Sequence, residues 1–183
     1  MLSIGCLREN NNNDFRVSLS PETSKKLIKK NINVFVQENC GLKSGFNNKD
    51  YENVGVKILK SSDSVIENSD IIISVNPLDI EYEKISKNTK SKIFVGNFNF
   101  KNTIPDNRFT FLALEKIPRI ARAQSMDILS SQASIAGYQS SLLAANHLKK
   151  YFPMLITAAG TISPAKILVI GAGVAGLQAI ATC

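Results

Sequence analysis

Short apolar runs alternate with polar and helix-forming stretches along the first part of the chain. These runs span residues 2–7, 32–36, 56–59, 71–75, 93–95 and 109–114. Runs that are apolar at consecutive positions, such as IIISV at 71–75, are typical of strands buried on both faces in a parallel sheet covered by helices. The pattern predicts an α/β domain with a parallel, doubly wound, Rossmann-like sheet that occupies about Met1 to Lys116.

A helix is predicted after the first strand. Ser20 offers an N-cap, and Pro21 occupies the first helical position, where a missing N–H costs nothing. We expect this helix to run to Lys30 and to end at Asn31.

A second, longer helix is predicted from Ser125 to Lys150. Gly137 inside it costs about 1 kcal/mol relative to alanine, so its presence predicts close packing against another element. The small and apolar side chains that recur at helical spacing on one side are Leu129, Ala133, Ala136, Ser140 and Leu143. This face should contact a neighbouring helix.

The pattern changes again after the long helix. Pro153 ends it, and the small residues of Thr157–Pro164 predict a linker. The run KILVI at 166–170 then predicts a strand that opens a new βα unit. We therefore predict two domains, an α/β domain over 1–154 and, over 155–183, a linker with the first βα unit of a truncated Rossmann domain.

Composition and charge narrow the class of protein. The chain is 44% apolar and 20% charged, which fits a soluble globular protein. The net charge is +7, but the lysines are scattered, and the densest run, at 25–30, is typical of a solvated helix face. We therefore expect no nucleic-acid partner.

The remaining compositional signals point to an ordinary intracellular chain. Cys6, Cys40 and Cys183 are isolated, so neither a disulfide framework nor a metal site is predicted. The first seven residues do not resemble a secretory signal. The uncharged stretch 167–183 is shorter than the ~20 residues that a membrane span needs.

The strongest local motif is GAGVAG, which follows KILVI and opens an apolar helix. Gly171 permits a tight turn, Gly173 allows close approach of a pyrophosphate, and Gly176 allows helix and strand to pack closely. The amides around Val174 and Ala175 lie at the helix N-terminus, which favours phosphate. A ligand-free glycine turn is the open alternative. The acidic residue that contacts the ribose is expected ~20 residues further on, beyond this sequence, so the motif does not distinguish NAD from NADP.

A second constellation lies in PRIARAQSMDILSSQASIAGY, residues 118–138. Asp127 stands where a loop enters a largely apolar helix. It is open whether this carboxylate caps the helix or pairs with Arg119 or Arg122, and periodicity alone favours the cap.

Three segments together resemble a known family. They are RENNNNDFRVSLSPE at 8–22, PRIARAQSMDILSSQ at 118–132 and ITAAGTISPAKILVIGAGVAG at 156–176. They resemble the NAD(H)-binding domain I in the alpha subunit of proton-translocating NAD(P) transhydrogenase, whose architecture alanine dehydrogenase shares. The resemblance covers the whole chain but only the N-terminal part of that domain.

The resemblance implies a function and a set of site residues. Arg119, Gln124 and Asp127 would form a loop that holds the nicotinamide of NAD(H) against that of NADP(H) on a partner domain, with Ser130 beside the carboxamide. Hydride would pass from NADH to NADP⁺, coupled to proton translocation. The implied partners are membrane and NADP(H)-binding domains or subunits and a second copy of domain I. The implied location is the cytoplasmic face of the inner membrane, or the matrix side in a mitochondrion.

Two alternatives follow from the same residues. Arg16 matches a position that holds the substrate carboxylate in alanine dehydrogenase. That enzyme also uses a Lys where this chain has Ser74 and Asn76, and a His in the region of FVGNFNF, residues 94–100, which contains none. The only histidine, His147, lies late in the long helix, where a surface role is expected. The second alternative is a catalytically silent, truncated lobe.

Overall fold

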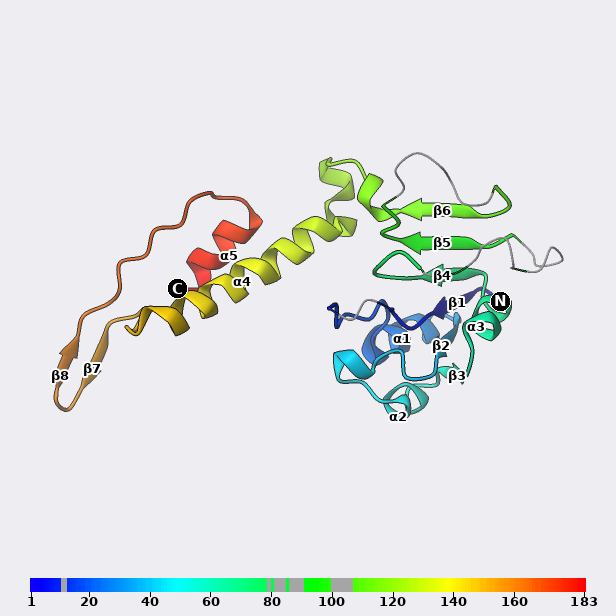
Figure 1. Cartoon of the computed structure of the whole chain (residues 1–183), viewed down its shortest axis with the longest axis horizontal. Helices are drawn as coiled ribbons and strands as arrows, with labels where there is room; N and C mark the ends of the chain where they lie inside the picture. Colours follow the sequence, from blue (N-terminus) through cyan, green and yellow to red (C-terminus); the bar gives the residue numbers. More distant parts are fainter. Residues whose placement is uncertain (11–12, 79, 81–84, 86–90, 100–106) are drawn as a thin grey trace. The chain divides into compact units, whose positions relative to one another are not determined.

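The computed structural model describes residues 1–10, 13–78, 80, 85, 91–99 and 107–183 (Figure 1). Within these ranges the chain forms two compact units, Met1–Lys116 and Ile117–Cys183. The asparagine-rich loop at 10–13 and the segment FVGNFNF lie partly outside the described residues. The division into domains at 154/155 stays a prediction.

The first unit contains a parallel six-stranded sheet. Its strands are β1 (Ser3–Cys6), β2 (Asn33–Gln37), β3 (Lys57–Leu59), β4 (Ile71–Ile73), β5 (Ile93–Gly96) and β6 (Thr110–Ala113). Their order is β3-β2-β1-β4-β5-β6, and every neighbouring pair is parallel. All six apolar runs thus form strands, and the predicted Rossmann-like sheet is confirmed.

Helices cover both faces of this sheet. They are α1 (Pro21–Ile28), α2 (Asn48–Glu52) and α3 (Ser62–Asn68), with a short 3₁₀ helix η1 (Leu42–Ser44) before α2. Successive strand residues point to opposite faces, so Ile71 and Ile73 pack in the cluster of α1 and α2, whereas Ile72 packs with Val65 and Ile66 of α3. The run at 71–73 is therefore packed on both sides.

The predicted start of α1 is confirmed. The Ser20 hydroxyl accepts a hydrogen bond from the Thr23 N–H at 3.2 Å, and Pro21 is the first helical residue. The helix ends at Ile28, two residues before the predicted end, because Asn31 already adopts a left-handed conformation with φ of 59°. The short helix thus leads directly into β2.

Lys92 is a buried cation at the amino end of β5. Its residue is only 4% exposed. Its Nζ donates to the Ser69 carbonyl at 2.6 Å and to the Glu67 carbonyl at 3.1 Å. These carbonyls lie at the C-terminal end of α3, where helix carbonyls lack partners within the helix. Lys92 therefore holds α3 against the sheet.

Replacing Lys92 with methionine should lower the free energy of unfolding by about 2 kcal/mol, because one buried and one part-buried carbonyl lose a charged donor. Urea unfolding measures this change. The matched control is Lys29→Met at the exposed end of α1, which should leave the unfolding midpoint unchanged. Equal midpoints for Lys92→Met and the control would contradict the role of Lys92.

The second unit is built around one long helix. The 3₁₀ helix η4 (Ala121–Met126) leads into α4 (Ile128–Leu148), which starts three residues later than predicted and ends two residues earlier. A 3₁₀ helix η3 (Leu114–Lys116) ends the first unit. Two strands, β7 (Leu155–Thr157) and β8 (Gly160–Ile162), and the helix α5 (Val174–Thr182) complete the second unit.

Two predictions for the end of the chain were wrong. The expected linker at 157–164 instead contributes to an antiparallel hairpin in which β7 pairs with β8. Gly160 follows the turn with φ of 128°, a conformation that favours glycine.

The expected strand KILVI at 166–170 does not form. Its Leu168 and Ile170 are 84% and 92% exposed, and no strand in the described part of the chain pairs with it. A strand needs a partner for its ladder of hydrogen bonds, so the apolar run alone leaves an extended segment.

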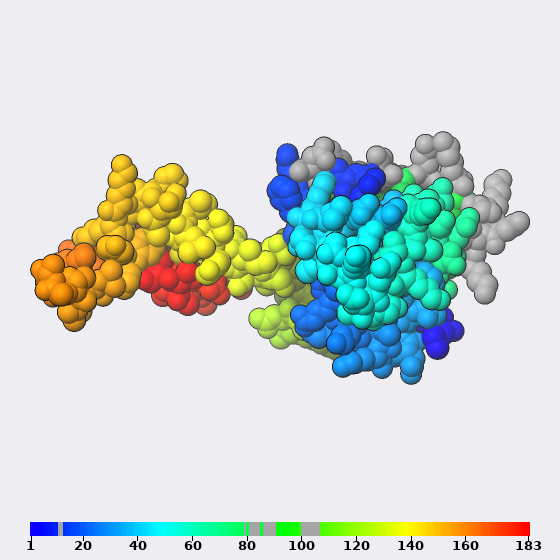
Figure 2. Space-filling model, turned by 90° about the horizontal axis from the view of Figure 1, so that it is seen from below, coloured from blue at the N-terminus to red at the C-terminus, as the bar shows by residue number. Residues whose placement is uncertain are grey.

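Close packing at Gly137 is confirmed. A Cβ added at this position would lie 2.2 Å from the carbonyl oxygen of Ala175 in α5. Ser134 Oγ donates to Gln178 Oε1 at 3.2 Å, and Ser141 Oγ donates to the Ala179 carbonyl at 3.3 Å. The red atoms of α5 lie against the yellow atoms of α4 in the space-filling view (Figure 2). Because Gly137 has no side chain, the backbones of α4 and α5 are in direct contact.

Candidate functional site

A cleft of about 530 Å³ lies in the second unit. It is bounded by the segment before α4, the first turns of α4 and the start of α5. Its lining residues are Pro118, Arg119, Ile120, Ala121, Ala123, Gln124, Asp127, Leu129, Ser130, Ala133, Gly173 and Val174. The four predicted loop residues, Arg119, Gln124, Asp127 and Ser130, therefore share one cleft with two residues of the glycine motif.

The glycine motif forms a tight turn in front of α5. Gly171 has φ of 107°, which side chains rarely adopt, and a Cβ at Gly176 would lie 2.0 Å from the Gly171 carbonyl oxygen. A Cβ at Gly173 would meet no atom within 4 Å. Gly171 and Gly176 thus serve the turn itself, whereas Gly173 faces open space where a ligand can approach.

The N-terminus of α5 presents backbone N–H groups to this space. Gly173 is the N-cap, and no described side chain accepts a hydrogen bond from the first turn. The amides of Val174, Ala175 and Gly176 lie in that turn. Unsatisfied N–H groups and the positive end of the helix dipole favour an anionic group such as phosphate.

Asp127 is the N-cap of α4. Its carboxylate accepts hydrogen bonds from the Leu129 N–H at 2.9 Å and the Ser130 N–H at 3.3 Å, and the Ser130 hydroxyl donates to it at 2.7 Å. The Ser130 hydroxyl is the main reason that the pKa of Asp127 is lowered. The cap interpretation is therefore correct.

The alternative to the cap, an ion pair between Asp127 and Arg119, is not formed. Within the described residues, the ion pairs join Arg16 to Asp14 and Lys26 to Glu22. Arg119 acts on Asp127 only as a more distant charge that also lowers its pKa. The backbone of α4, rather than an arginine, satisfies this carboxylate.

Several cleft residues lie in the segment 118–138 that the sequence singled out, but none of them was given a role in the site. Leu129 and Ala133 were assigned to a helix–helix contact, but both line the cleft. Ile120 and Ala121 belong to a segment without apolar periodicity. Only the position of α5 beside α4 shows that these residues face the same space as the glycine turn.

Gly176→Ala should lower the free energy of unfolding by about 1–3 kcal/mol, because the new methyl group would overlap a backbone carbonyl that cannot move independently. Thermal unfolding followed by circular dichroism measures it. Gly173→Ala is the matched control and should destabilise less than Gly176→Ala, since its methyl group meets no neighbour and only the N-cap preference for glycine is lost. A stable Gly176→Ala variant would refute this account of the turn.

Acid should weaken the start of α4. Because the folded pKa of Asp127 is lowered from its ordinary value of 3.8, its charge stabilises the fold above that value. The contribution is lost as pH falls through the folded pKa. The difference in urea midpoint between the wild type and Asp127→Asn should therefore shrink between about pH 6 and about pH 3. A difference that stays constant with pH would show that this charge does not support the helix.

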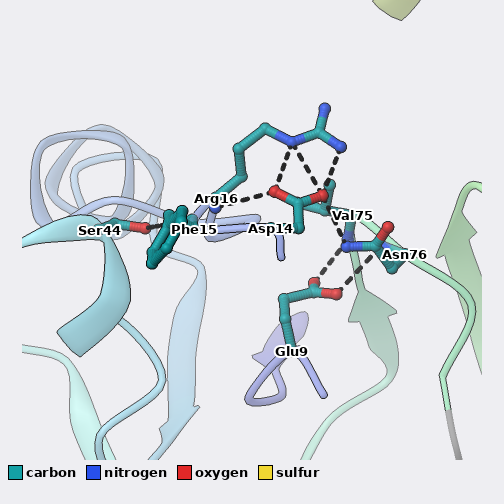
Figure 3. A network of polar contacts seen from close by, with 7 residues as sticks. All are labelled: Glu9, Asp14, Phe15, Arg16, Ser44, Val75 and Asn76. Atoms are coloured by element: carbon teal, nitrogen blue, oxygen red, sulfur yellow. Dashed lines mark hydrogen bonds and ion pairs between the residues drawn. The ribbon is translucent and has the colours of Figure 1, made fainter. Parts of the chain in front are cut away.

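A separate polar network lies in the first unit, where the loops after β1 and β4 meet (Figure 3). The Asp14 carboxylate accepts hydrogen bonds from Arg16 Nε at 2.9 Å, from Arg16 Nη2 at 2.6 Å and from Asn76 Nδ2 at 3.0 Å. The buried Glu9 carboxylate accepts from the Val75 N–H at 2.6 Å and the Asn76 N–H at 3.0 Å. The guanidinium of Arg16 thus already holds a carboxylate of the same chain.

The residues at the positions used by alanine dehydrogenase do not provide a titratable catalytic side chain. Ser74 is buried at the end of β4, and its hydroxyl has no hydrogen-bond partner in the described residues. Asn76 supplies an amide where a lysine was expected. His147 is exposed near the end of α4. No group of three or more His, Cys, Asp or Glu side chains in the described ranges could hold a metal ion.

The fold and the glycine turn define an α/β protein of the Rossmann-like class. The family model "Alanine dehydrogenase/PNT, N-terminal domain" matches residues 5–136, and "Alanine dehydrogenase/PNT, C-terminal domain" matches residues 140–183. The chain therefore belongs to the alanine dehydrogenase/PNT family.

Transhydrogenase subunits are among its similar relatives. An NAD(P) transhydrogenase alpha-subunit protein of Rickettsia prowazekii is 41% identical over 99% of this chain and 49% of that protein. A crystal structure of transhydrogenase from Sinorhizobium meliloti has a TM-score of 0.79 and 34% identity, over 98% of this chain and 55% of that one. Alanine dehydrogenase of Staphylococcus haemolyticus is more distant, at 27% identity over 97% of this chain and 49% of that protein.

The matched relatives are longer than this chain. The chain spans about half the length of each of these three proteins. No helix in the described ranges combines the length and the apolar character needed to cross a bilayer.

Proposed function

We propose that this chain is part of the NAD(H)-binding component of a proton-translocating NAD(P) transhydrogenase, which passes hydride from NADH to NADP⁺. The observation that carries the proposal is the cleft of the second unit, which is lined both by the segment before α4 and by the glycine turn. The similarity to transhydrogenase subunits supports it.

The glycine turn suits the pyrophosphate of NAD(H). Gly171 and Gly176 make the turn, Gly173 leaves room for the phosphates, and the amides of Val174 and Ala175 donate to them. When bound, NAD(H) supplies the hydride. The turn binds and aligns the cofactor without adding any group that takes part in proton transfer.

The segment before α4 suits the nicotinamide. Hydride transfer between two nicotinamides needs no general acid or base, but it needs aligned rings and exclusion of water. Gln124 can hydrogen-bond a ribose or carboxamide without adding charge, and Ser130 lines the same cleft. Asp127 orders this segment through the helix cap, and the exposed Arg119 adds a positive charge to the cleft. These four side chains would position the nicotinamide.

The partners and the location follow from the same proposal. NADP(H) would bind to a partner domain, and other segments or subunits would cross the membrane. The complete component would be a homodimer on the cytoplasmic face of the inner membrane, or on the matrix side in a mitochondrion. Residues 1–154 would form one domain and 155–183 the start of another. The exposed Leu168 and Ile170 support this division, because further strands of a complete Rossmann domain would cover them.

The alternatives have less support. For an amino-acid oxidoreductase resembling alanine dehydrogenase, this chain lacks the catalytic lysine, since it has Ser74 and Asn76 in that segment. Its Arg16 is also already paired with Asp14. A catalytically silent lobe would leave the shared cleft without a role. The transhydrogenase proposal accounts for both the glycine turn and the segment before α4.

Gln124→Asn in the complete protein, assembled with its NADP(H)-binding and membrane parts, tests the proposal. Shortening the side chain by one methylene should slow hydride transfer by about 10²-fold, because a ~1 Å error in ring position has that effect. NADH affinity should stay within a few fold. Stopped-flow transfer between bound nucleotides and equilibrium titration measure the two quantities separately.

The matched control is Gln132→Asn, which changes an exposed glutamine of α4 outside the cleft and should leave both quantities unchanged. Lost NADH affinity with a normal hydride step in the bound complex would make Gln124 a binding residue. Turnover with pyruvate and ammonium in the complete protein would instead favour the amino-acid oxidoreductase.

A further inference from the structure

The contact between α4 and α5 is made by small side chains, which do not by themselves define one register. The backbone at Gly137 meets that of Ala175, and one turn further along α5 stands a second alanine, Ala179. A helix repeats its surface about every 5.4 Å, so the space at Gly137 suits either alanine. The hydrogen bond from Ser141 ends on a backbone carbonyl, which every residue offers. Neither contact therefore distinguishes two positions of α5 that differ by one turn.

One side-chain pair does distinguish them. Ser134 Oγ donates to Gln178 Oε1 at 3.2 Å. Gln178 Nε2 donates to Thr182 Oγ1 at 3.2 Å, and the Thr182 hydroxyl donates to the Gln178 carbonyl at 2.7 Å. Because its proton is engaged, the Thr182 hydroxyl accepts from the amide nitrogen, and the amide oxygen of Gln178 faces Ser134. The Gln178 side chain is thus held in one orientation toward α4.

The hydroxyl of Ser134 is used differently from that of a neighbouring serine. A serine inside a helix commonly donates to the carbonyl four residues earlier, as Ser140 does to Ala136 at 2.7 Å. Ser134 instead donates to the adjacent helix. Ser134 and Gln178 are both half-buried, and a polar pair within a helix contact is a known means of fixing register.

A shift of α5 by one turn would break this pair. It would bring either Val174 or Thr182 opposite Ser134. Valine has no side-chain acceptor, and the threonine hydroxyl lies closer to its own backbone than the glutamine oxygen does. The observed register is therefore the one in which Ser134 has a partner on α5.

The register sets the distance between the two walls of the cleft. Gly173 and Val174 at the start of α5 line one wall, and Gln124 and Ser130 line the other. Moving α5 by one turn would shift the glycine turn by about 5.4 Å relative to α4. Hydride transfer tolerates far less, since a ~1 Å error in ring position costs about 10²-fold in rate.

We infer that Ser134 and Gln178 are positioning residues: their hydrogen bond selects the register of α5 on α4 and so sets the distance between the phosphate site at the glycine turn and Gln124. Both residues lie outside the lining of the cleft, and they act through the helices that carry it. The role toward the nicotinamide rests on the proposed function, whereas the selection of the register does not.

Ser134→Ala tests the inference on the whole 183-residue chain. Alanine is the better helix former, so the variant should stay folded. In ¹H–¹⁵N spectra of the wild type, NADH should shift the backbone amides of 173–176 and the side-chain amide of Gln124. In the variant, half-saturation at 173–176 should stay within about twofold, but the Gln124 shift should fall to the level that ADP-ribose gives. ADP-ribose is NADH without its nicotinamide and should shift 173–176 alone in both proteins.

Two matched variants separate the register from a general loss of structure. Ser134→Thr keeps the hydroxyl and should restore the Gln124 shift. Ser140→Ala makes the same substitution on the same helix but removes a hydroxyl that bonds its own helix, and it should behave like the wild type.

The register is also measured without a nucleotide. The Hα atoms of Gly137 and Ala175 are close enough for a nuclear Overhauser effect, because the two backbones are in contact. This effect should weaken in Ser134→Ala and in Gln178→Leu, which removes the acceptor. It should persist in Ser134→Thr and Ser140→Ala.

The outcomes separate this inference from the proposed function. A Ser134→Ala variant that keeps the Gln124 shift would overturn the inference and leave the proposed function in place. An equal loss of that shift in Ser140→Ala would overturn it too, since the loss would not depend on the contact with α5. A wild type without shifts at 173–176 would overturn the proposed function, and the Overhauser effect between Gly137 and Ala175 would still decide the register.

Discussion

The backbone contact between α4 and α5 is the constraint on which the candidate cleft depends. The missing side chain at Gly137 lets the Ala175 carbonyl approach α4, and Ser134 and Ser141 add hydrogen bonds along the same line. This contact brings the glycine turn in front of α5 to the first turns of α4, where Asp127 caps the helix. Both sides line the same cleft.

The two units divide features that a single Rossmann domain combines. The first unit has the strand order of a dinucleotide-binding sheet, but the turn after β1 carries no glycine motif. At its strand reversal, Arg16 and Asn76 hold the carboxylate of Asp14. The second unit has the glycine turn with free amides but no strand beside it in the described residues. A phosphate group is therefore better accommodated in the second unit.

The sequence predicted those features that local chemistry determines. Continuous apolar runs gave the six strands, Ser20 and Pro21 gave the start of α1, and Gly137 indicated close packing. Features that depend on distant partners were not predictable. KILVI resembles a strand, but no strand in the described ranges pairs with it. The hairpin strands β7 and β8 are three residues each, too short to show a periodicity. Asp14 and Asn76 are 62 positions apart, and only the strand order brings them together.

The position of bound NADH tests the central claim most directly. A ¹H–¹⁵N spectrum of the chain titrated with NADH to about 1 mM is sensitive to weak binding, on the order of hundreds of micromolar or worse, which is what we expect. The account predicts shifts of the backbone amides of 173–176 together with the side-chain amide of Gln124. Shifts confined to Arg16 and Asn76, at the carboxyl edge of the six-stranded sheet, would place the nucleotide in the first unit and contradict the account.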